Sequence, residues 1–275
     1  YTGRTEIISF KDSYHGSTAG ALSICGNENL KNSFRPLIPD NRILNFGILE
    51  ALNSITKKTA AVIIEPIQGE GGVRTASKEY FQKLRKQCDD HGALLIFDEI
   101  QTGFGRTGKF WAMEHYNVVP DILLCAKGMG GGMPIGAFIS SKEIMQSLTH
   151  NPILGHITTF GGHPVSSAAA LATLNVILEE NLMQGVAEKE RIFHDHLIHD
   201  KILDVRSKGL LIAIEFESFL YVQRIIKNLL ELGVLSDWFL FCDNSIRIAP
   251  PLIITNEEIK MACNKILQAI KMSYK

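Results

Sequence analysis

Short apolar runs that alternate with helical patterns are the feature that most constrains the fold of this chain. Four runs have the length of a strand and are apolar almost throughout, at residues 60–66, 93–99, 121–127 and 136–140. Runs of this kind are typical of strands that are covered on both faces of a sheet. Between the first two runs, helical spacing predicts a helix that begins after Ser77 and ends at Gly92. Strand–helix–strand alternation predicts a largely parallel α/β sheet.

The pattern changes in the last third of the chain. The alanine-rich stretch from Pro164 predicts a long helix, and helical spacing continues beyond it. A strand, a helix and a strand are then predicted at residues 209–217, 221–233 and 245–252. A final helix begins at Thr255, which forms a capping box with Glu258. We therefore expect a large domain over residues 1–180 and a smaller C-terminal α/β domain over residues 181–275.

Composition excludes several classes of partner. The 275 residues are 45% hydrophobic and 21% charged, and the net charge of −1 provides no basic field for nucleic acid or an anionic membrane. No apolar run approaches the roughly 18 residues of a membrane span. The five cysteines are scattered, with no CxxC pair, which fits a reducing compartment. We expect a cytoplasmic protein with neither a nucleic-acid nor a membrane partner.

A run of histidine and aspartate raises the possibility of a metal site. The stretch contains His194, Asp195, His196, His199 and Asp200. Side chains two positions apart on a helix diverge, so only part of this set would share a face. We therefore expect a solvated helix face here and no metal site.

Polar residues end three of the apolar runs. Glu65, Asp98 and Lys127 stand where parallel strands present their carboxyl ends, the edge at which open α/β sheets bind ligands. The glycines after Lys127 would let the backbone approach a ligand, and its amine could act as a nucleophile. The alternative is an Asp98–Lys127 ion pair without chemistry. Because both residues precede glycine-rich loops at strand ends, the pattern favours a site.

Six stretches resemble the class III aminotransferases, in the order in which that family has them. They are "YHGSTAGAL", "EPIQGEGGV", "LIFDEIQTGFGRTGKFWAMEH", "VPDILLCAKGMGGGMPIGA", "HITTFGGHP" and "IRIAPPLIIT". The resemblance spans almost the whole chain and is most specific from Leu94 to Ala137. It implies pyridoxal-phosphate fold type I, as in aspartate aminotransferase. It also implies transfer of an amino group from an amine or amino acid, of the acetylornithine, ornithine or ω-amino-acid type, to a 2-oxo acid.

The resemblance assigns roles around pyridoxal 5′-phosphate. Asp98 would keep the pyridine nitrogen protonated, so that the ring acts as an electron sink. Lys127 would bind the cofactor covalently and later shuttle a proton. Gln101 would contact the phenolic oxygen, and Tyr14 would stack on the ring. The implied cofactor-binding set is Tyr14, His15, Gly16, Asp98, Gln101, Lys127 and Thr159.

Further implied roles concern the substrate and a second subunit. Thr159, with Thr158 as the fallback, would bind the cofactor phosphate of the neighbouring subunit, which implies a homodimer with a shared active site. Arg247 would grip a substrate carboxylate, and Glu70 would pair with that arginine. Arg106 is expected to have a structural ion-pair partner.

Two departures from the family pattern matter. No Ser-Gly-Ser/Thr phosphate-binding turn precedes Tyr14, so we expect that an N-terminal portion is missing. Ser17 stands in "HGST", where relatives commonly have "HGRT" and the arginine grips a second carboxylate. Serine cannot make that bidentate charged contact, which puts 2-oxoglutarate as the acceptor in doubt.

Two other functions stay open on the sequence alone. An aminomutase or decarboxylase of the same fold would use the same lysine and aspartate. A catalytically silent fragment that only dimerises would keep the fold without the reaction.

Overall fold

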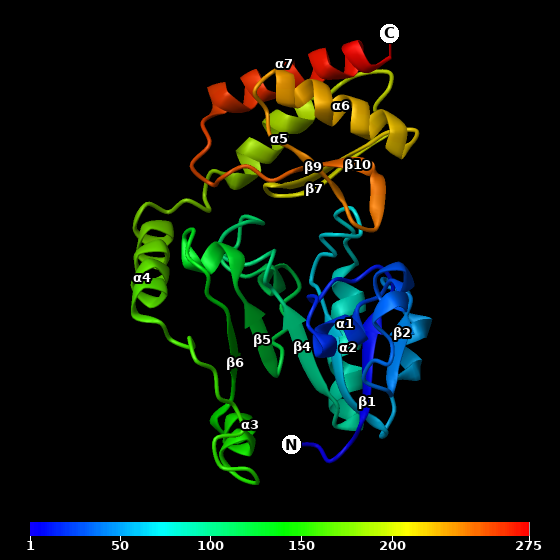
Figure 1. Ribbon diagram of the computed structural model, residues 1–275, viewed down its shortest axis with the longest axis vertical. Coiled ribbons are helices and arrows are strands. Elements are labelled where there is room, and N and C mark those ends of the chain that lie inside the picture. Colours follow the sequence, from blue (N-terminus) through cyan, green and yellow to red (C-terminus); the bar gives the residue numbers. More distant parts are fainter. Residues whose placement is uncertain (275) are drawn as a thin grey trace.

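The computed structural model describes residues 1–274, which form two sheets with helices packed on them (Figure 1). The first sheet has the order β2-β1-β3-β4-β5-β6. Its strands are β1 (Glu6–Phe10), β2 (Asn41–Leu44), β3 (Thr59–Ile64), β4 (Leu94–Asp98), β5 (Ile122–Cys125) and β6 (Ala137–Ser140). All neighbours pair in parallel except β5 and β6, which are antiparallel. The predicted, largely parallel sheet is confirmed.

The second sheet is antiparallel throughout and has the order β7-β8-β10-β9. Its strands are β7 (Asp204–Lys208), β8 (Leu211–Glu215), β9 (Asp237–Phe239) and β10 (Cys242–Ile248). The sequence pattern indicated β8 and β10, whereas the outer strands β7 and β9 were not predicted. Strand β7 is largely polar and β9 has only three residues, so neither carries an apolar run that would reveal it.

Seven α-helices complete the described part of the chain. They are α1 (Ala19–Ile24), α2 (Lys78–His91), α3 (Lys142–Gln146), α4 (Pro164–Glu179), α5 (Val186–His196), α6 (Phe219–Glu231) and α7 (Asn256–Ser273). Single 3₁₀ turns are η1 (Glu28–Leu30), η2 (Asn32–Phe34), η3 (Glu50–Ser54), η4 (Ala112–His115), η5 (Lys127–Gly130) and η6 (Ser147–Thr149). Within this part of the chain, no helix is both long and apolar enough to span a membrane.

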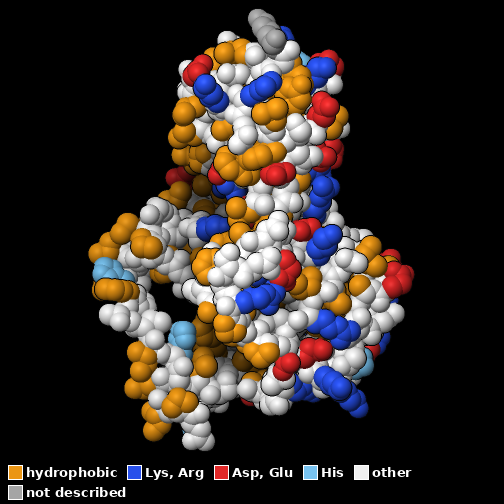
Figure 2. All heavy atoms as spheres, turned by 45° about the vertical axis from the view of Figure 1, so that its right-hand side comes forward, with side chains coloured by type: hydrophobic (Ala, Val, Ile, Leu, Met, Phe, Trp, Pro, Cys, Tyr) orange, Lys and Arg blue, Asp and Glu red, His pale blue; other side chains and the backbone are white. Residues whose placement is uncertain are grey.

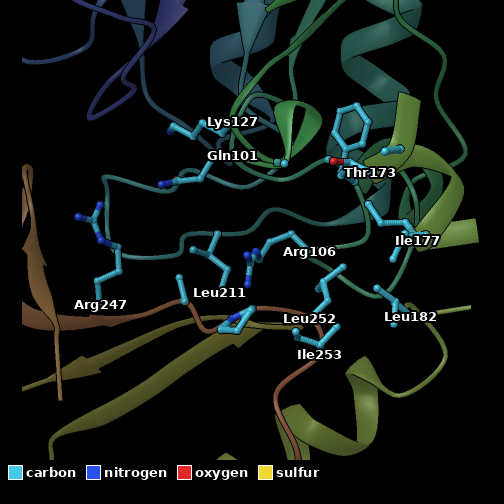
Figure 3. A pocket seen from close by; sticks show the side chains of 18 residues that line it. Gln101, Arg106, Lys127, Thr173, Ile177, Leu182, Leu211, Arg247, Leu252 and Ile253 are labelled. Atoms are coloured by element: carbon cyan, nitrogen blue, oxygen red, sulfur yellow. The ribbon is translucent and has the colours of Figure 1, made fainter. Parts of the chain in front are cut away.

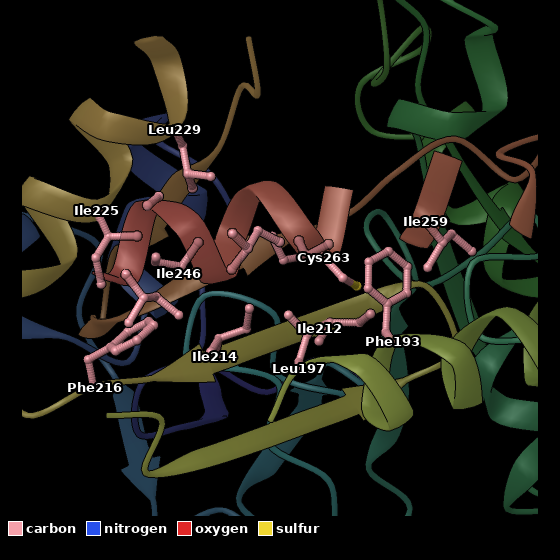
Figure 4. Close-up of a cluster of buried hydrophobic side chains, with 14 of the residues drawn as sticks. Phe193, Leu197, Ile212, Ile214, Phe216, Ile225, Leu229, Ile246, Ile259 and Cys263 are labelled. Carbon is pink, nitrogen blue, oxygen red and sulfur yellow. The ribbon is translucent and has the colours of Figure 1, made fainter. Parts of the chain in front are cut away.

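Each sheet has its own hydrophobic core. Helix α2 packs on the first sheet through Tyr80, Phe81 and Leu84, which are almost fully buried. Helices α5, α6 and α7 cover the second sheet, where Ile212 and Ile214 meet apolar side chains of all three helices (Figure 4). The boundary expected after residue 180 lies between α4 and α5, and it stays a prediction.

The histidine-rich stretch lies only partly on a helix, because α5 ends within it. Helix α5 stops at His196, and His199 lies beyond it, where its Nδ1 is 2.8 Å from Asp200 Oδ1. The predicted helical continuation past His196 is therefore wrong. Among residues 1–274, no group of three or more His, Cys, Asp or Glu side chains is placed to hold a metal ion.

The segment from α3 to α4 forms a lobe of its own beside β6 (Figure 1). Helix α4 has no charged residue before Glu179, yet several of its apolar side chains are exposed. Figure 2 shows hydrophobic side chains along this lobe and a hollow between it and the rest of the molecule. The most exposed apolar residues of the segment are Ile153, Leu154, Ile157, Phe160, Val165, Leu171 and Leu178. A helix that is apolar on all sides is normally buried, so this surface lacks a covering partner here.

The cap of α2 can be tested separately from the site. Ser77 Oγ accepts a hydrogen bond from the backbone N–H of Tyr80 at 3.1 Å, whereas Ser218, at the same position of α6, makes no such bond. We expect Ser77→Ala to lower the free energy of unfolding by about 1 kcal/mol. Ser218→Ala is the matched control and should cost much less. Equal losses in urea denaturation would contradict the role of the Ser77 cap.

Candidate active site

The carboxyl ends of β3, β4 and β5 enclose a small cavity of about 90 Å³. It lies where the sequence placed the site, because parallel strands present their ends at one edge of the sheet. The lining residues are Tyr14, His15, Gly16, Glu65, Ile67, Glu70, Asp98, Ile100, Gln101, Thr102 and Lys127. The structure thus brings together every predicted site residue except Thr159 and Arg247.

Asp98 meets His15. The Oδ2 atom of Asp98 is 2.8 Å from His15 Nδ1, and Oδ1 accepts the backbone N–H of Ile100 at 3.1 Å. Both side chains are buried, at 1% exposure for His15 and 4% for Asp98. The alternative ion pair between Asp98 and Lys127 is not formed in the described structure. Sequence reasoning placed His15 in the site but missed its bond to Asp98.

Lys127 begins the turn η5, two residues after β5 ends. Its backbone has φ of +43°, a left-handed conformation that is unusual for a side chain of this size. Such conformations cluster at functional sites, because the surrounding structure must hold them in place. Lys127 is exposed and lines the cavity, so it is not buried in an apolar setting.

Gln101 depends on a glycine in the loop after β3. A Cβ atom added at Gly69 would lie 1.4 Å from Gln101 Oε1, so any other residue at position 69 would displace this amide. The Nε2 atom of Gln101 lies 3.5 Å from Glu70 Oε1, which connects the two loops across the cavity. Gly69 in "QGEGG" therefore leaves space for the side chain of Gln101 in addition to forming part of the turn.

Two buried polar atoms at this cavity have no partner among the described residues: Glu65 Oε2 and His15 Nε2. Burial raises the pKa of Glu65 well above its usual value, and the nearby carboxylate of Asp98 raises it further. Unpaired buried polar atoms are rare and indicate a missing ligand or water. Glu65 and His15 thus mark the cavity as a place for a polar ligand.

Glu99 shows the contrasting case of a satisfied buried carboxyl. It accepts hydrogen bonds from the hydroxyl of Thr102 at 2.6 Å and from the backbone N–H groups of Ala112 and Met113 at 2.9 and 2.7 Å. Burial raises the pKa of Glu99 as well. With all its contacts made inside the protein, Glu99 holds the loop after β4 and has a structural role.

The lining residues fit the ring of pyridoxal phosphate. Asp98 offers an acceptor for a protonated ring nitrogen, Gln101 an amide for a phenolic oxygen, and Lys127 an amine for an aldehyde. Tyr14 contributes an aromatic face, and its hydroxyl is 3.0 Å from Ser17 Oγ. No phosphate-binding turn is found among the residues that line the cavity.

Arg247 opens onto a second, larger cavity of about 840 Å³ that shares Lys127 and Gln101 with the first (Figure 3). Its Nη1 is 2.8 Å from Glu70 Oε1, so the predicted pair is formed. Most of the other walls are apolar: Phe104, Ala172, Val176, Ile177, Leu182, Leu211, Leu252 and Ile253. This arrangement offers a cation beside Lys127 and space for an apolar group.

Arg106 has a structural role, but its partners differ from the expected ion pair. Its guanidinium donates to the backbone carbonyls of Leu210 and Pro250, and within residues 1–274 no carboxylate lies within ion-pair distance. Burial lowers the pKa of Arg106. Because Leu210 precedes β8 and Pro250 follows β10, Arg106 fixes the second sheet against the loop after β4.

Thr159 lies outside both cavities. It belongs to the lobe between α3 and α4 and is exposed, as is Thr158. The structure therefore does not bring Thr159 to the site of its own chain.

The chain is similar to known aminotransferases. The acetylornithine aminotransferase of Alnus glutinosa, named as mitochondrial, is 40% identical over 273 residues, which are 97% of this chain and 59% of that protein. The ornithine aminotransferase of Toxoplasma gondii, solved with partial occupancy of PLP, superposes with a TM-score of 0.90 at 32% identity. That match covers 99% of this chain and 66% of the solved one.

A third relative is an amine transaminase from an uncultivated Pseudomonas species, solved in its PLP-bound form. It superposes with a TM-score of 0.88 at 30% identity, over 98% of this chain and 70% of that one. This chain spans about 59% of its plant relative's length. The sequence model of the class-III aminotransferases matches residues 1–270. The chain therefore belongs to the class-III aminotransferase family.

Proposed function

We propose that this protein transfers an amino group from an amine or amino acid to a 2-oxo acid, with pyridoxal 5′-phosphate as its cofactor. The observation that carries the proposal is the meeting of Lys127, Asp98 and Gln101 at one cavity. Family membership and the solved PLP-bound relatives support the same cofactor. When bound, pyridoxal phosphate supplies an aldehyde for the amino group and a ring that withdraws electrons from the reacting carbon.

The side chains around the cavity have distinct tasks in this reaction. Asp98 would accept a hydrogen bond from the protonated ring nitrogen, while His15 and the N–H of Ile100 keep the carboxylate in place. The amine of Lys127 would hold the cofactor and, once freed, move a proton at the reacting carbon. Gln101 would orient the ring through its oxygen substituent. Arg247 receives a substrate carboxylate when Glu70 releases it.

Lys127→Ala tests the reaction directly. We expect the variant to lose the borohydride-trapped cofactor adduct and at least about a hundredfold of its turnover, because no other group replaces the amine. Peptide mass spectrometry locates the adduct, and an assay of the amino acid formed from the 2-oxo acid acceptor follows the reaction. Lys109→Ala, at an exposed lysine of the loop before η4, is the control and should keep both.

Several outcomes would contradict this proposal. An adduct at one site in Lys127→Ala would overturn the lysine assignment. Carbon dioxide or a rearranged amine, with no amino acid formed from the 2-oxo acid acceptor, would indicate a decarboxylase or an aminomutase. A wild-type chain with no adduct at all would indicate a silent fragment.

For the substrates, we propose donors of the acetylornithine, ornithine or ω-amino-acid type and an acceptor with one carboxylate. The support is that Ser17 offers a hydroxyl beside Tyr14 and no charge. The second carboxylate of 2-oxoglutarate would then lack a cationic partner at this position. Pyruvate needs only one such partner, which Arg247 supplies.

Ser17→Arg tests the choice of acceptor. We expect the ratio of kcat/KM for 2-oxoglutarate over pyruvate to rise by about ten- to a hundredfold, because a bidentate charged contact replaces a neutral one. Ser17→Lys is the comparison and should give a smaller rise, since an ammonium lacks the planar fork. A native preference for 2-oxoglutarate that neither change alters would show that another residue makes the contact.

We also propose that the protein is a homodimer with an active site shared between subunits. The exposed apolar lobe from α3 to α4 needs a covering partner, and Thr159 lies in that lobe, away from its own cavity. A second copy that covers the lobe would bring Thr159 close to the neighbouring site. Homodimers bury such surfaces routinely.

The proposed interface can be tested with two matched leucines. Leu171 on α4 is 59% exposed and Leu230 on α6 is 61% exposed, so both tolerate a charge in the isolated chain. We expect Leu171→Asp to shift the protein from dimer to monomer in sedimentation velocity, and Leu230→Asp to leave the dimer intact. A monomeric wild type at micromolar concentration would contradict the proposal.

For the compartment, we propose the cytoplasm. All five cysteines are free, and Cys25, Cys88, Cys125 and Cys263 are buried. Unpaired thiols fit a reducing environment. Fluorescent tagging of the natural protein tests this location against the mitochondrion named for the plant relative.

A further inference from the structure

The guanidinium of Arg247 is held by two carboxylates. Its Nη1 is 2.8 Å from Glu70 Oε1, and its Nη2 is 3.2 Å from Asp237 Oδ2. The Glu70 side chain is 9% exposed, and that of Asp237 is 55% exposed. Each terminal nitrogen of the guanidinium therefore has its own carboxylate partner: the nearly buried Glu70 for Nη1 and the exposed Asp237 for Nη2.

The two partners come from different parts of the fold. Strands β9 and β10 place Asp237 directly opposite Arg247 in their antiparallel register. Glu70 comes from the loop after β3, where its Oε2 also accepts the backbone N–H of Leu240 at 3.1 Å. Asp237 thus stays beside Arg247 whenever the β9–β10 hairpin is intact, whereas Glu70 reaches Arg247 from a loop outside this sheet.

Charge counting shows what this arrangement does to a substrate. Two carboxylates against one guanidinium leave the group with a net negative charge. Arg247 lines the large cavity beside Lys127, and none of the other residues that line this cavity is acidic. A substrate carboxylate that enters the cavity meets an arginine whose charge is already more than neutralised. An amine without a carboxylate meets no such barrier.

We propose that Asp237 determines donor specificity, by keeping Arg247 occupied and so favouring donors that have no carboxylate on the reacting carbon. The inference rests on the proposed transamination and adds to it a residue that the family resemblance did not indicate. If Glu70 were the only partner of Arg247, a substrate carboxylate could take the place of Glu70 without changing the net charge at Arg247. With Asp237 present, the substrate carboxylate must also overcome an anion that remains in place.

The chain contains a matched control for this arrangement. Arg206 also has two carboxylate partners, although both contact its Nη1: a less exposed Glu215, and Asp204, whose carboxylate is 2.9 Å away and 54% exposed. Arg206 does not line the large cavity. Asp204→Asn therefore removes an equally exposed carboxylate from a similar arginine, away from Lys127.

Two donors that differ only in the carboxylate provide the kinetic test. Isopropylamine is alanine with a methyl group in place of the carboxylate. We expect Asp237→Asn to raise the ratio of kcat/KM for alanine over isopropylamine by about two- to fivefold, the range for an exposed charge. The rise should shrink in 1 M salt, which screens the pair. Asp204→Asn should leave the ratio at its wild-type value.

A binding measurement tests the affinity of Arg247 for a carboxylate without catalytic turnover. Trp238 follows Asp237 and is 38% exposed, so its fluorescence can report carboxylate binding at this hairpin. Propionate should bind about two- to fivefold more tightly to Asp237→Asn than to the wild type or Asp204→Asn. Propionamide, its neutral analogue, should show no such difference, and Trp238→Phe should remove the signal.

The outcomes separate this inference from the proposed function. If both donors react but neither the donor ratio nor propionate binding distinguishes Asp237→Asn from Asp204→Asn, the role of Asp237 is overturned and the transaminase stands. If no donor reacts in any variant, the proposed function fails, and propionate binding alone decides whether Asp237 restrains Arg247.

Discussion

The buried hydrogen bond between His15 Nδ1 and Asp98 is the contact on which the rest of the site depends. It joins the loop after β1 to the end of β4, and β3 lies between these two strands in the sheet. The bond therefore crosses the carboxyl end of β3, where Glu65 stands. Loss of His15 would leave Asp98 buried without its side-chain partner, which is costly for a charged group. His15 and Asp98 both line the cavity, so this bond fixes two of its walls relative to each other.

Local signals predicted the elements that carry the site. Strands β3, β4 and β5 appeared as apolar runs, and the caps of α2 and α7 followed from residues within four positions of each helix start. The reversal of β6 against β5 was not predicted, because a short apolar run does not encode the direction of its neighbour. Strand β2 was missed because its residues are half exposed and partly polar.

Within the site, sequence reasoning succeeded for residues next to a strand end and failed for contacts between distant segments. Asp98 could be placed because it ends β4, and Lys127 because it lies two residues after the end of β5. The partner of Asp237 depends on the pairing of β9 with β10, which contains an irregularity between Cys242 and Ile246. Arg106 binds backbone carbonyls more than a hundred residues away, and no residue type marks a carbonyl in advance.

The unpaired carboxyl of Glu65 couples this cavity to the proton concentration of the solution. Its pKa is raised in the folded chain, so the folded state keeps this proton to a higher pH than the unfolded chain does. Stability from this group is therefore full below the ordinary carboxyl pKa and declines as the pH rises through the folded value. A ligand that gives Glu65 Oε2 a cationic partner would expel that proton. Calorimetry in buffers of different ionisation enthalpy would then record proton release as part of the binding heat.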